Sequence, residues 1–170
     1  MNSSTPSPSW TPETSYRGIS NYENNRMRIT TSAMKELRAH LNFTQIRFHC
    51  RKQQTRTFHV TTVVNSTGEA VVQYFSGQTD VLPSSCNSYQ RLEGDNSQLA
   101  IQCDQWGNDG SHYVGKWGHH TKQRENRMYD HAAFIAHKYH WVIVNGYWLC
   151  DDTGSNYKLS LGDFWKIYVR

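Results

Sequence analysis

The sequence predicts a mainly β domain, either a β-sandwich or a strongly curved antiparallel sheet, with one or two short helices on its flank. Residues 45–50 and 164–169 alternate between apolar and polar side chains, which indicates strands with one buried face. The dipeptide Asn145-Gly146, which favours a two-residue hairpin turn, lies between two further apolar segments. These three observations favour antiparallel strands.

A polar segment precedes the predicted domain. Residues 1–15 are rich in Ser and Thr and contain three of the four prolines, and residues 16–29 remain polar. This composition is typical of an interdomain linker or stalk, because it offers little apolar surface to bury. We therefore expect a flexible tail over 1–29 and a single disulfide-stabilised, β-rich domain over 30–170.

The first elements follow directly after this tail. Thr31 or Ser32 is suited to cap a helix over 33–40, whose buried stripe would hold Met34, Leu37 and Leu41. After the strand at 45–50, segments 57–64 and 69–75 flank Asn65-Ser66-Thr67-Gly68. This arrangement predicts a central hairpin that is apolar on both faces.

The second half contains a helix, a long loop and several strands. Asp95, Asn96 or Ser97 is placed to cap a helix through Trp106. Residues 107–126 predict a long loop with a short strand near 113–117. The remaining strands are expected over 132–136, 139–144, 147–150 and 164–169.

The four cysteines allow three pairings. We favour Cys86–Cys103, which closes a local loop, and Cys50–Cys150, which joins the first core strand to a late one. Such bonds indicate an oxidising compartment. The alternative is four reduced, buried thiols in a cytosolic protein.

Asn-x-Ser/Thr sequons occur at Asn2, Asn42 and Asn65, and we expect glycosylation at Asn42 and Asn65. Residues 1–16 contain no apolar stretch that would form a signal peptide. We therefore expect an extracellular fragment of a longer secreted protein.

The formal net charge is only +4, and no segment has the length and apolarity of a membrane span. The nearest basic cluster comprises Arg47, Arg51, Lys52 and Arg56, and we interpret it as a solvated strand end and turn. Neither nucleic-acid binding nor membrane insertion is expected. A cytosolic nucleic-acid binder remains an alternative that requires free thiols.

The order of motifs resembles a cysteine-paired extracellular module of large secreted or matrix proteins of invertebrate animals. The resemblance covers residues 30–170. It is carried, in order, by Arg47-Phe48-His49-Cys50, Val71-Val72-Gln73-Tyr74-Phe75-Ser76-Gly77, Cys86, Cys103-Asp104-Gln105-Trp106, Gly115-Lys116-Trp117, Tyr129-Asp130-His131, His140-Trp141, Cys150-Asp151-Asp152 and Gly162-Asp163-Phe164-Trp165-Lys166. It implies a secreted protein and brings no established activity. The disulfide and calcium-loop patterns of fibrinogen-type and C-type lectins are absent.

The segment 104–120 is the strongest candidate for a ligand site, because it combines aromatic rings, short carboxylates, an amide and glycines. Carbohydrate recognition uses this mixture: a ring covers the C–H face of a sugar while polar groups bind its hydroxyls. Trp106 follows the helix stripe and is expected in the core. The candidate ligand-binding residues are Asp104, Asn108, Asp109, Tyr113, Trp117, His119, His120 and Trp148.

Metal binding and catalysis receive less support. Asp151 and Asp152 follow a strand with further oxygen ligands nearby and form a candidate calcium site, although an acidic turn is the alternative. His119-His120 and His137-x-x-His140 match no established zinc motif, and no nucleophile elbow or phosphate loop occurs. We expect no cofactor other than calcium.

The expected function is therefore an extracellular, non-enzymatic binding module, carbohydrate-binding (lectin-like) or involved in matrix adhesion. Its partner would be a glycan or an extracellular protein. The alternatives are a purely structural matrix domain, whose aromatic residues would all be buried, and a metal-dependent hydrolase using His119, His120 and nearby carboxylates.

Overall fold

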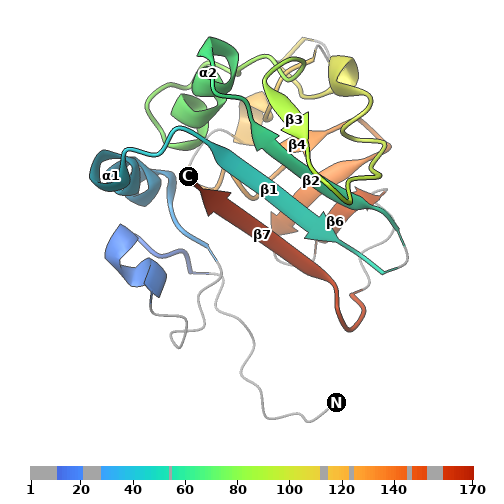
Figure 1. The fold of residues 1–170 in the computed structure, drawn as a ribbon, viewed down its shortest axis with the longest axis horizontal. Coiled ribbons are helices and arrows are strands. Elements are labelled where there is room, and N and C mark those ends of the chain that lie inside the picture. The colour runs from blue at the N-terminus through green and yellow to red at the C-terminus, as the bar shows by residue number, and fades with distance from the viewer. Residues whose placement is uncertain are drawn as a thin grey trace.

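The computed structural model describes residues 11–20, 28–53, 55–111, 115–122, 125–144, 147–152 and 159–170. These residues form a mainly β fold with two antiparallel sheets and two α-helices, as predicted. The four-stranded sheet has the order β3-β2-β1-β7 and the three-stranded sheet the order β4-β5-β6. Figure 1 shows the four-stranded sheet in front of the other sheet, with α1 and α2 beside the end where β1 begins.

The strands of the larger sheet are β1 (Ile46–Arg51), β2 (Thr57–Thr62), β3 (Tyr89–Arg91) and β7 (Phe164–Val169). Those of the smaller sheet are β4 (Ala133–Phe134), β5 (His140–Val144) and β6 (Tyr147–Asp152). Every pairing within the two sheets is antiparallel. The predictions for β1, β5 and β7 are confirmed, while β4 is shorter and β6 longer than expected.

The predicted β5–β6 turn falls on Asn145 and Gly146, which lie outside the described residues. Val144 pairs with Tyr147 on either side of them. The antiparallel pairing of β5 with β6 is therefore as expected, and the turn type stays a prediction.

Helix α1 (Thr31–Leu41) confirms the first predicted helix, but two details differ. Its cap is Thr30, whose side chain accepts a hydrogen bond from the Ala33 amide at 3.1 Å. Leu41 was expected in the buried stripe, yet it is more than half exposed. The helix ends there, because Asn42 adopts the left-handed conformation that terminates many helices.

The predicted hairpin around 65–68 is wrong, because residues 66–75 form helix α2 (Ser66–Phe75). The Asn65 side chain accepts hydrogen bonds from the amides of Thr67 and Gly68, and so acts as a helix cap. The apolar residues of 69–75 were expected on both faces of a strand. They instead form a wide buried side of helix α2. Gly68 faces the chain before the helix so closely that a Cβ atom there would lie 1.9 Å from the Val63 carbonyl oxygen.

The helix predicted through Trp106 is also wrong. Only the short 3-10 helix Cys103–Gln105 forms in that segment. The amides of Gln98 and Leu99 donate to the Asp151 side chain at 3.0 and 2.6 Å, so a tertiary contact replaces the helical pattern.

The two sheets enclose an aromatic core. Phe48 of β1 lies 5.2–5.4 Å, between ring centroids, from Phe75 of α2, Trp117 and Trp141 of β5. Trp106 and Trp117 meet edge to face at 4.9 Å. Both disulfides form with the predicted pairing, Cys50–Cys150 between the sheets and Cys86–Cys103 in the segment that follows α2. The pairing indicates an oxidising, extracellular-type environment.

Part of the segment expected as a tail contacts the domain. Glu13 exchanges backbone hydrogen bonds with Arg28 and Thr30, and the Tyr16 ring lies 5.2 Å from that of His40 on α1. No helix in the described part of the chain is long and apolar enough to cross a membrane.

Candidate functional site

The tryptophans of segment 104–120 belong to the core. Trp106 and Trp117 are fully buried, which confirms the expectation for Trp106. The indole N–H of Trp117 donates to the Ser88 hydroxyl at 2.8 Å, and that of Trp106 donates to the Leu99 carbonyl at 2.7 Å. The proposed role of Trp117 as a ligand-stacking ring is therefore replaced by a structural one, because its ring has no exposed face.

The polar residues of the same segment form turns. Asn108 accepts a hydrogen bond from the Gly110 amide and Asp109 from the Ser111 amide. Asp104 is exposed in the 3-10 helix, and its main chain lies against Gly115. Tyr113 lies outside the described residues. The segment therefore places polar side chains at the surface. Of the rings predicted to bind a ligand in this segment, only those of His119 and His120 are described there.

Those two histidines join a column of rings that was not foreseen. His120 stacks on His119 at 5.0 Å, His119 on Phe134 at 5.4 Å, and Phe134 on His140 at 6.0 Å, with nearly parallel planes. His131 meets Phe134 and His140 edge-on. The column joins β4, β5 and the loop before them, and no spacing in the sequence reveals it.

Hydrogen bonds show which ring nitrogens of this column accept and which donate. The Thr121 amide donates to His119 Nδ1 at 3.1 Å, so that nitrogen bears no proton. His131 Nδ1 lies 2.8 Å from an Asp130 carboxylate oxygen and donates to it. His140 Nδ1 is buried and has no hydrogen-bond partner among the described residues. Burial, helped by the nearby His131 and His137, lowers the pKa of His140 to about 4.

The histidine column does not form a metal centre. Within the described ranges, no group of three or more His, Cys, Asp or Glu side chains is arranged to hold a metal ion. His137, the other member of the predicted His-x-x-His pair, is exposed in the β4–β5 turn. The described residues therefore supply no ligand set for the metal-dependent hydrolase.

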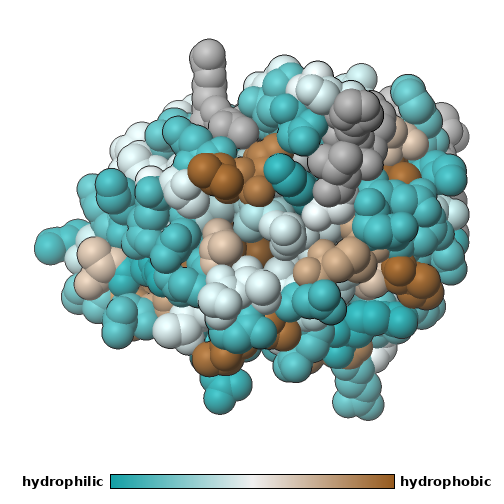
Figure 2. All heavy atoms as spheres, turned by 90° about the horizontal axis from the view of Figure 1, so that it is seen from above, coloured by the Kyte–Doolittle hydropathy of each residue, from teal (hydrophilic) through white to brown (hydrophobic). Residues whose placement is uncertain are grey.

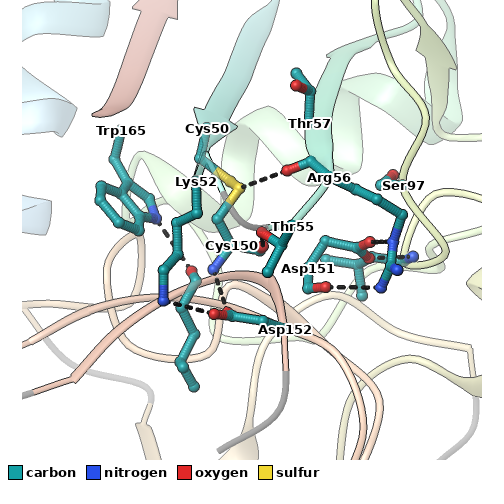
Figure 3. Close-up of a disulfide and its surroundings, with 12 residues drawn as sticks. Cys50, Lys52, Thr55, Arg56, Thr57, Ser97, Cys150, Asp151, Asp152 and Trp165 are labelled. Atoms are coloured by element: carbon teal, nitrogen blue, oxygen red, sulfur yellow. Dashed lines mark hydrogen bonds and ion pairs between the residues drawn. A yellow bond between two sulfur atoms is a disulfide. The ribbon is translucent and has the colours of Figure 1, made fainter. Parts of the chain in front are cut away.

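Asp151 and Asp152, the candidate calcium ligands, lie beside the Cys50–Cys150 disulfide and point in different directions (Figure 3). Asp151 is fully buried, forms an ion pair with Arg56 and accepts the two amides that fix the Gln98–Leu99 turn. Asp152 pairs with buried Lys52 at 2.6 Å. Because each carboxylate faces its own cation, the two side chains act as structural anchors. The neighbouring oxygen ligands expected for calcium, at 153–156, lie outside the described residues, so calcium binding stays a prediction.

Trp148, the last predicted ligand residue, also packs against the core. Its side chain is half-buried, its ring lies 5.5 Å from that of Trp165, and its carbonyl accepts a hydrogen bond from Lys52. Through this contact with Trp165, the Trp148 ring packs against β7.

Both sequons within the described residues are exposed at helix ends. Asn42 terminates α1 and Asn65 caps α2. Glycosylation at Asn42 and Asn65 stays a prediction that their exposure permits.

The outer face of the four-stranded sheet is the surface that sequence reasoning missed. It consists of alternate residues of four paired strands: Arg47, His49 and Arg51 of β1, Thr57, His59 and Thr61 of β2, Gln90 of β3, and Phe164, Lys166 and Tyr168 of β7. These side chains are all exposed or half-buried. Because the smaller sheet lies behind, this face points toward the viewer in Figure 1.

Cations and rings alternate on this outer face. The Arg47 guanidinium lies 4.4 Å from the centroid of the Tyr168 ring, and the Lys166 ammonium lies 5.1 Å from that of Phe164. His49 and His59 stack at 3.8 Å in the centre. The alternation of Arg47, His49 and Arg51 was visible in the sequence, but the pairing of β1 with β7, more than a hundred residues away, was not.

The view from above shows a different kind of surface. There, hydrophobic residues form small separate groups among hydrophilic ones (Figure 2). The described residues seen in this view therefore form no continuous apolar patch of the kind that marks many protein interfaces.

No known family model matches the chain, and neither a curated protein nor a solved structure matches it. The resemblance to an invertebrate extracellular module stays a prediction. The functional interpretation therefore depends on the geometry of the described surfaces.

Proposed function

We propose that this chain is a secreted, non-enzymatic binding module that binds carbohydrate through the outer face of its four-stranded sheet. The observation that carries the proposal is the pairing of Arg47 with the 40% exposed Tyr168 ring. An aromatic ring covers the apolar C–H face of a sugar, and an adjacent guanidinium donates hydrogen bonds to its oxygens. Lys166 and Phe164 repeat this combination nearby.

The scaffold beneath this face supports binding without large rearrangement. Arg47 pairs with Thr61 on one side and Tyr168 on the other, so its strand is central in the sheet. The Cys50–Cys150 disulfide fixes the same strand to the second sheet. A rigid backbone lowers the entropy lost on binding, because the ligand-contacting positions are already in place.

Two alternatives from the sequence lead to different expectations. A purely structural matrix domain agrees with the burial of Trp117, but it leaves the exposed rings of the outer face without a role. A metal-dependent hydrolase would require metal ligands among His119, His120 and nearby carboxylates, and the described residues offer no such group.

A glycan array probed with the fully oxidised protein tests the proposal. We expect selective glycan binding that Tyr168→Ala abolishes. Tyr147→Ala is a matched control, because Tyr147 is similarly exposed on β6 but does not belong to the outer face. Absence of binding to every glycan, or equal losses in the two variants, would overturn the proposal.

A further inference from the structure

We infer that the outer face selects a polyanionic chain, and that its partner is a sulfated polysaccharide. This inference rests on the proposed carbohydrate-binding function and specifies the chemistry of the carbohydrate. It arises from the charges that the fold brings together on the outer face, which differ from the basic cluster visible in the sequence.

The fold divides that sequence cluster into two pairs. Lys52 and Arg56 turn inward and pair with Asp152 and Asp151. Arg47 and Arg51 stay on the outer face, where β7 adds a third cation. Lys166 lies opposite His49, between the two arginines along β1. Diagonal neighbours in a sheet lie about 7–8 Å apart, so the three cations form a triangle that several anionic groups of one chain can contact.

In the described part of the chain, no carboxylate forms an ion pair with a cation of this triangle. None of the outer-face positions defined above carries Asp or Glu. At the margins, Asp163 accepts the amides of Gln53 and Ser160, and Asp95 accepts the His59 amide and the Arg91 guanidinium. The exposed Glu93 side chain lies beyond β3. The face is therefore a cationic surface with its acidic neighbours already engaged or at its edge.

His49 lies within the positive field of this face, which adds to the effect of burial on its pKa. Burial, His59, Arg47 and Lys166 together lower the pKa of His49 to about 4. His59 Nδ1 donates to the Glu93 carbonyl at 2.9 Å, because a carbonyl oxygen only accepts. Besides this pair of histidines, the basic side chains of the face are Arg47, Arg51 and Lys166.

Three features favour a sulfated polysaccharide over other polyanions. The disulfides indicate an extracellular-type environment, where acidic polysaccharides are the available anionic polymers. The exposed ring of Tyr168 and the half-buried ring of Phe164 are suited to the C–H faces of sugars. The alternating polar and charged residues of the sheet offer no apolar wedge for insertion into a lipid surface.

The test is binding of heparin to the oxidised protein, with chemically desulfated heparin as the reference. We expect tighter binding to heparin and an affinity that falls with salt, because binding releases counterions from the polyanion. The variant Arg47→Gln/Arg51→Gln/Lys166→Gln should weaken binding by about tenfold or more and flatten the salt dependence. Arg17→Gln/Lys35→Gln/Lys138→Gln removes the same charge from exposed positions outside the face and should bind like the unmodified protein.

An NMR titration of His49 provides a readout that does not depend on affinity alone. Heparin on the outer face should raise the pKa of His49 from its low value, because the polyanion offsets the field of Arg47 and Lys166. A pKa that stays unchanged in the heparin complex would place the polysaccharide elsewhere and overturn the inference.

The remaining outcomes separate the inference from the proposed function. Suppose that neutral glycans bind through Tyr168 and that heparin binds no more tightly than its desulfated form. That result would overturn the inference of a polyanionic partner and leave the carbohydrate function intact. Equal or tighter binding to double-stranded DNA or to phosphatidylserine vesicles would overturn the polysaccharide as partner. Absence of binding to any glycan would overturn both.

Discussion

Lys52 Nζ lies 2.6 Å from Asp152 Oδ2, and the two side chains are 2% and 4% exposed. This buried ion pair lies next to the Cys50–Cys150 disulfide, where Asp151 and Arg56 form a second pair (Figure 3). Lys52 also donates to the Trp148 carbonyl, and Asp152 accepts the Cys150 amide at 2.7 Å. The acidic dipeptide after Cys150 therefore ties β6 to the segment that follows β1.

We predict that Lys52→Met lowers the free energy of unfolding by about 3–5 kcal/mol, because it leaves the Asp152 charge buried without its partner. Urea denaturation at neutral pH measures the loss. The double variant Lys52→Met/Asp152→Leu should lose less than the single variant, because it removes both charges. A double variant at least as unstable as the single one would contradict the pair's role.

The disulfides should differ in their effect on stability. They join residues 100 and 17 positions apart. In the chain-entropy model, closing these loops contributes about 4–5 kcal/mol for Cys50–Cys150 and about 3 kcal/mol for Cys86–Cys103. We therefore expect Cys50→Ser/Cys150→Ser to have the lower denaturant midpoint, when compared with Cys86→Ser/Cys103→Ser. An equal or reversed order would refute this entropic explanation.

The two pairings could be predicted from the sequence because Cys50 and Cys150 each lie in a clearly alternating or apolar strand, and Cys86 and Cys103 are close along the chain. Strand alternation likewise predicted β1 and β7. Helix α2 was missed because Asn65-Ser66-Thr67-Gly68 has the composition of a turn as well as of a helix cap. In the structure the Asn65 side chain caps a helix whose apolar residues are buried against the core, which the local composition alone does not reveal.

The candidate site was less accessible to prediction, for a physical reason. Sequence spacing shows which residues share a face of one strand, but not which strands pair. Arg47 and Lys166 became neighbours only through the β1–β7 ladder, and His119 and His140 only through Phe134. In segment 104–120, composition suggested an open site, although the aromatic side chains of Trp106 and Trp117 were needed for the core.

His140 should make stability depend on pH. Its pKa is about 4 in the folded protein and near 6.5 when exposed. Between these values the unfolded chain binds a proton that the folded protein excludes, so stability falls as the pH is lowered from about 6.5 toward 4. The full loss amounts to about 3 kcal/mol below the folded pKa.

Thermal or urea unfolding at pH 7 and pH 4.5 measures this effect. His140→Phe keeps a ring next to Phe134 but cannot titrate, so its stability should fall less on acidification. His40→Gln, at an exposed position on α1, is the control and should follow the unmodified protein. If His140→Phe shows the same pH dependence as the unmodified protein, His140 is not the group responsible.

Asn65 combines two roles that substitutions can separate. Its side-chain oxygen Oδ1 caps α2, while the sequon Asn65-Ser66-Thr67 would place a glycan on its amide nitrogen. After expression through a eukaryotic secretory pathway, we predict that Asn65→Ser and Asn65→Ala each lose one glycan in intact-mass measurements. Because Ser is also a good cap, only Asn65→Ala should lower the free energy of unfolding, by about 1 kcal/mol, when deglycosylated samples are compared. Equal stability of the two variants would show that the cap contributes little, and an unchanged mass would show that Asn65 carries no glycan.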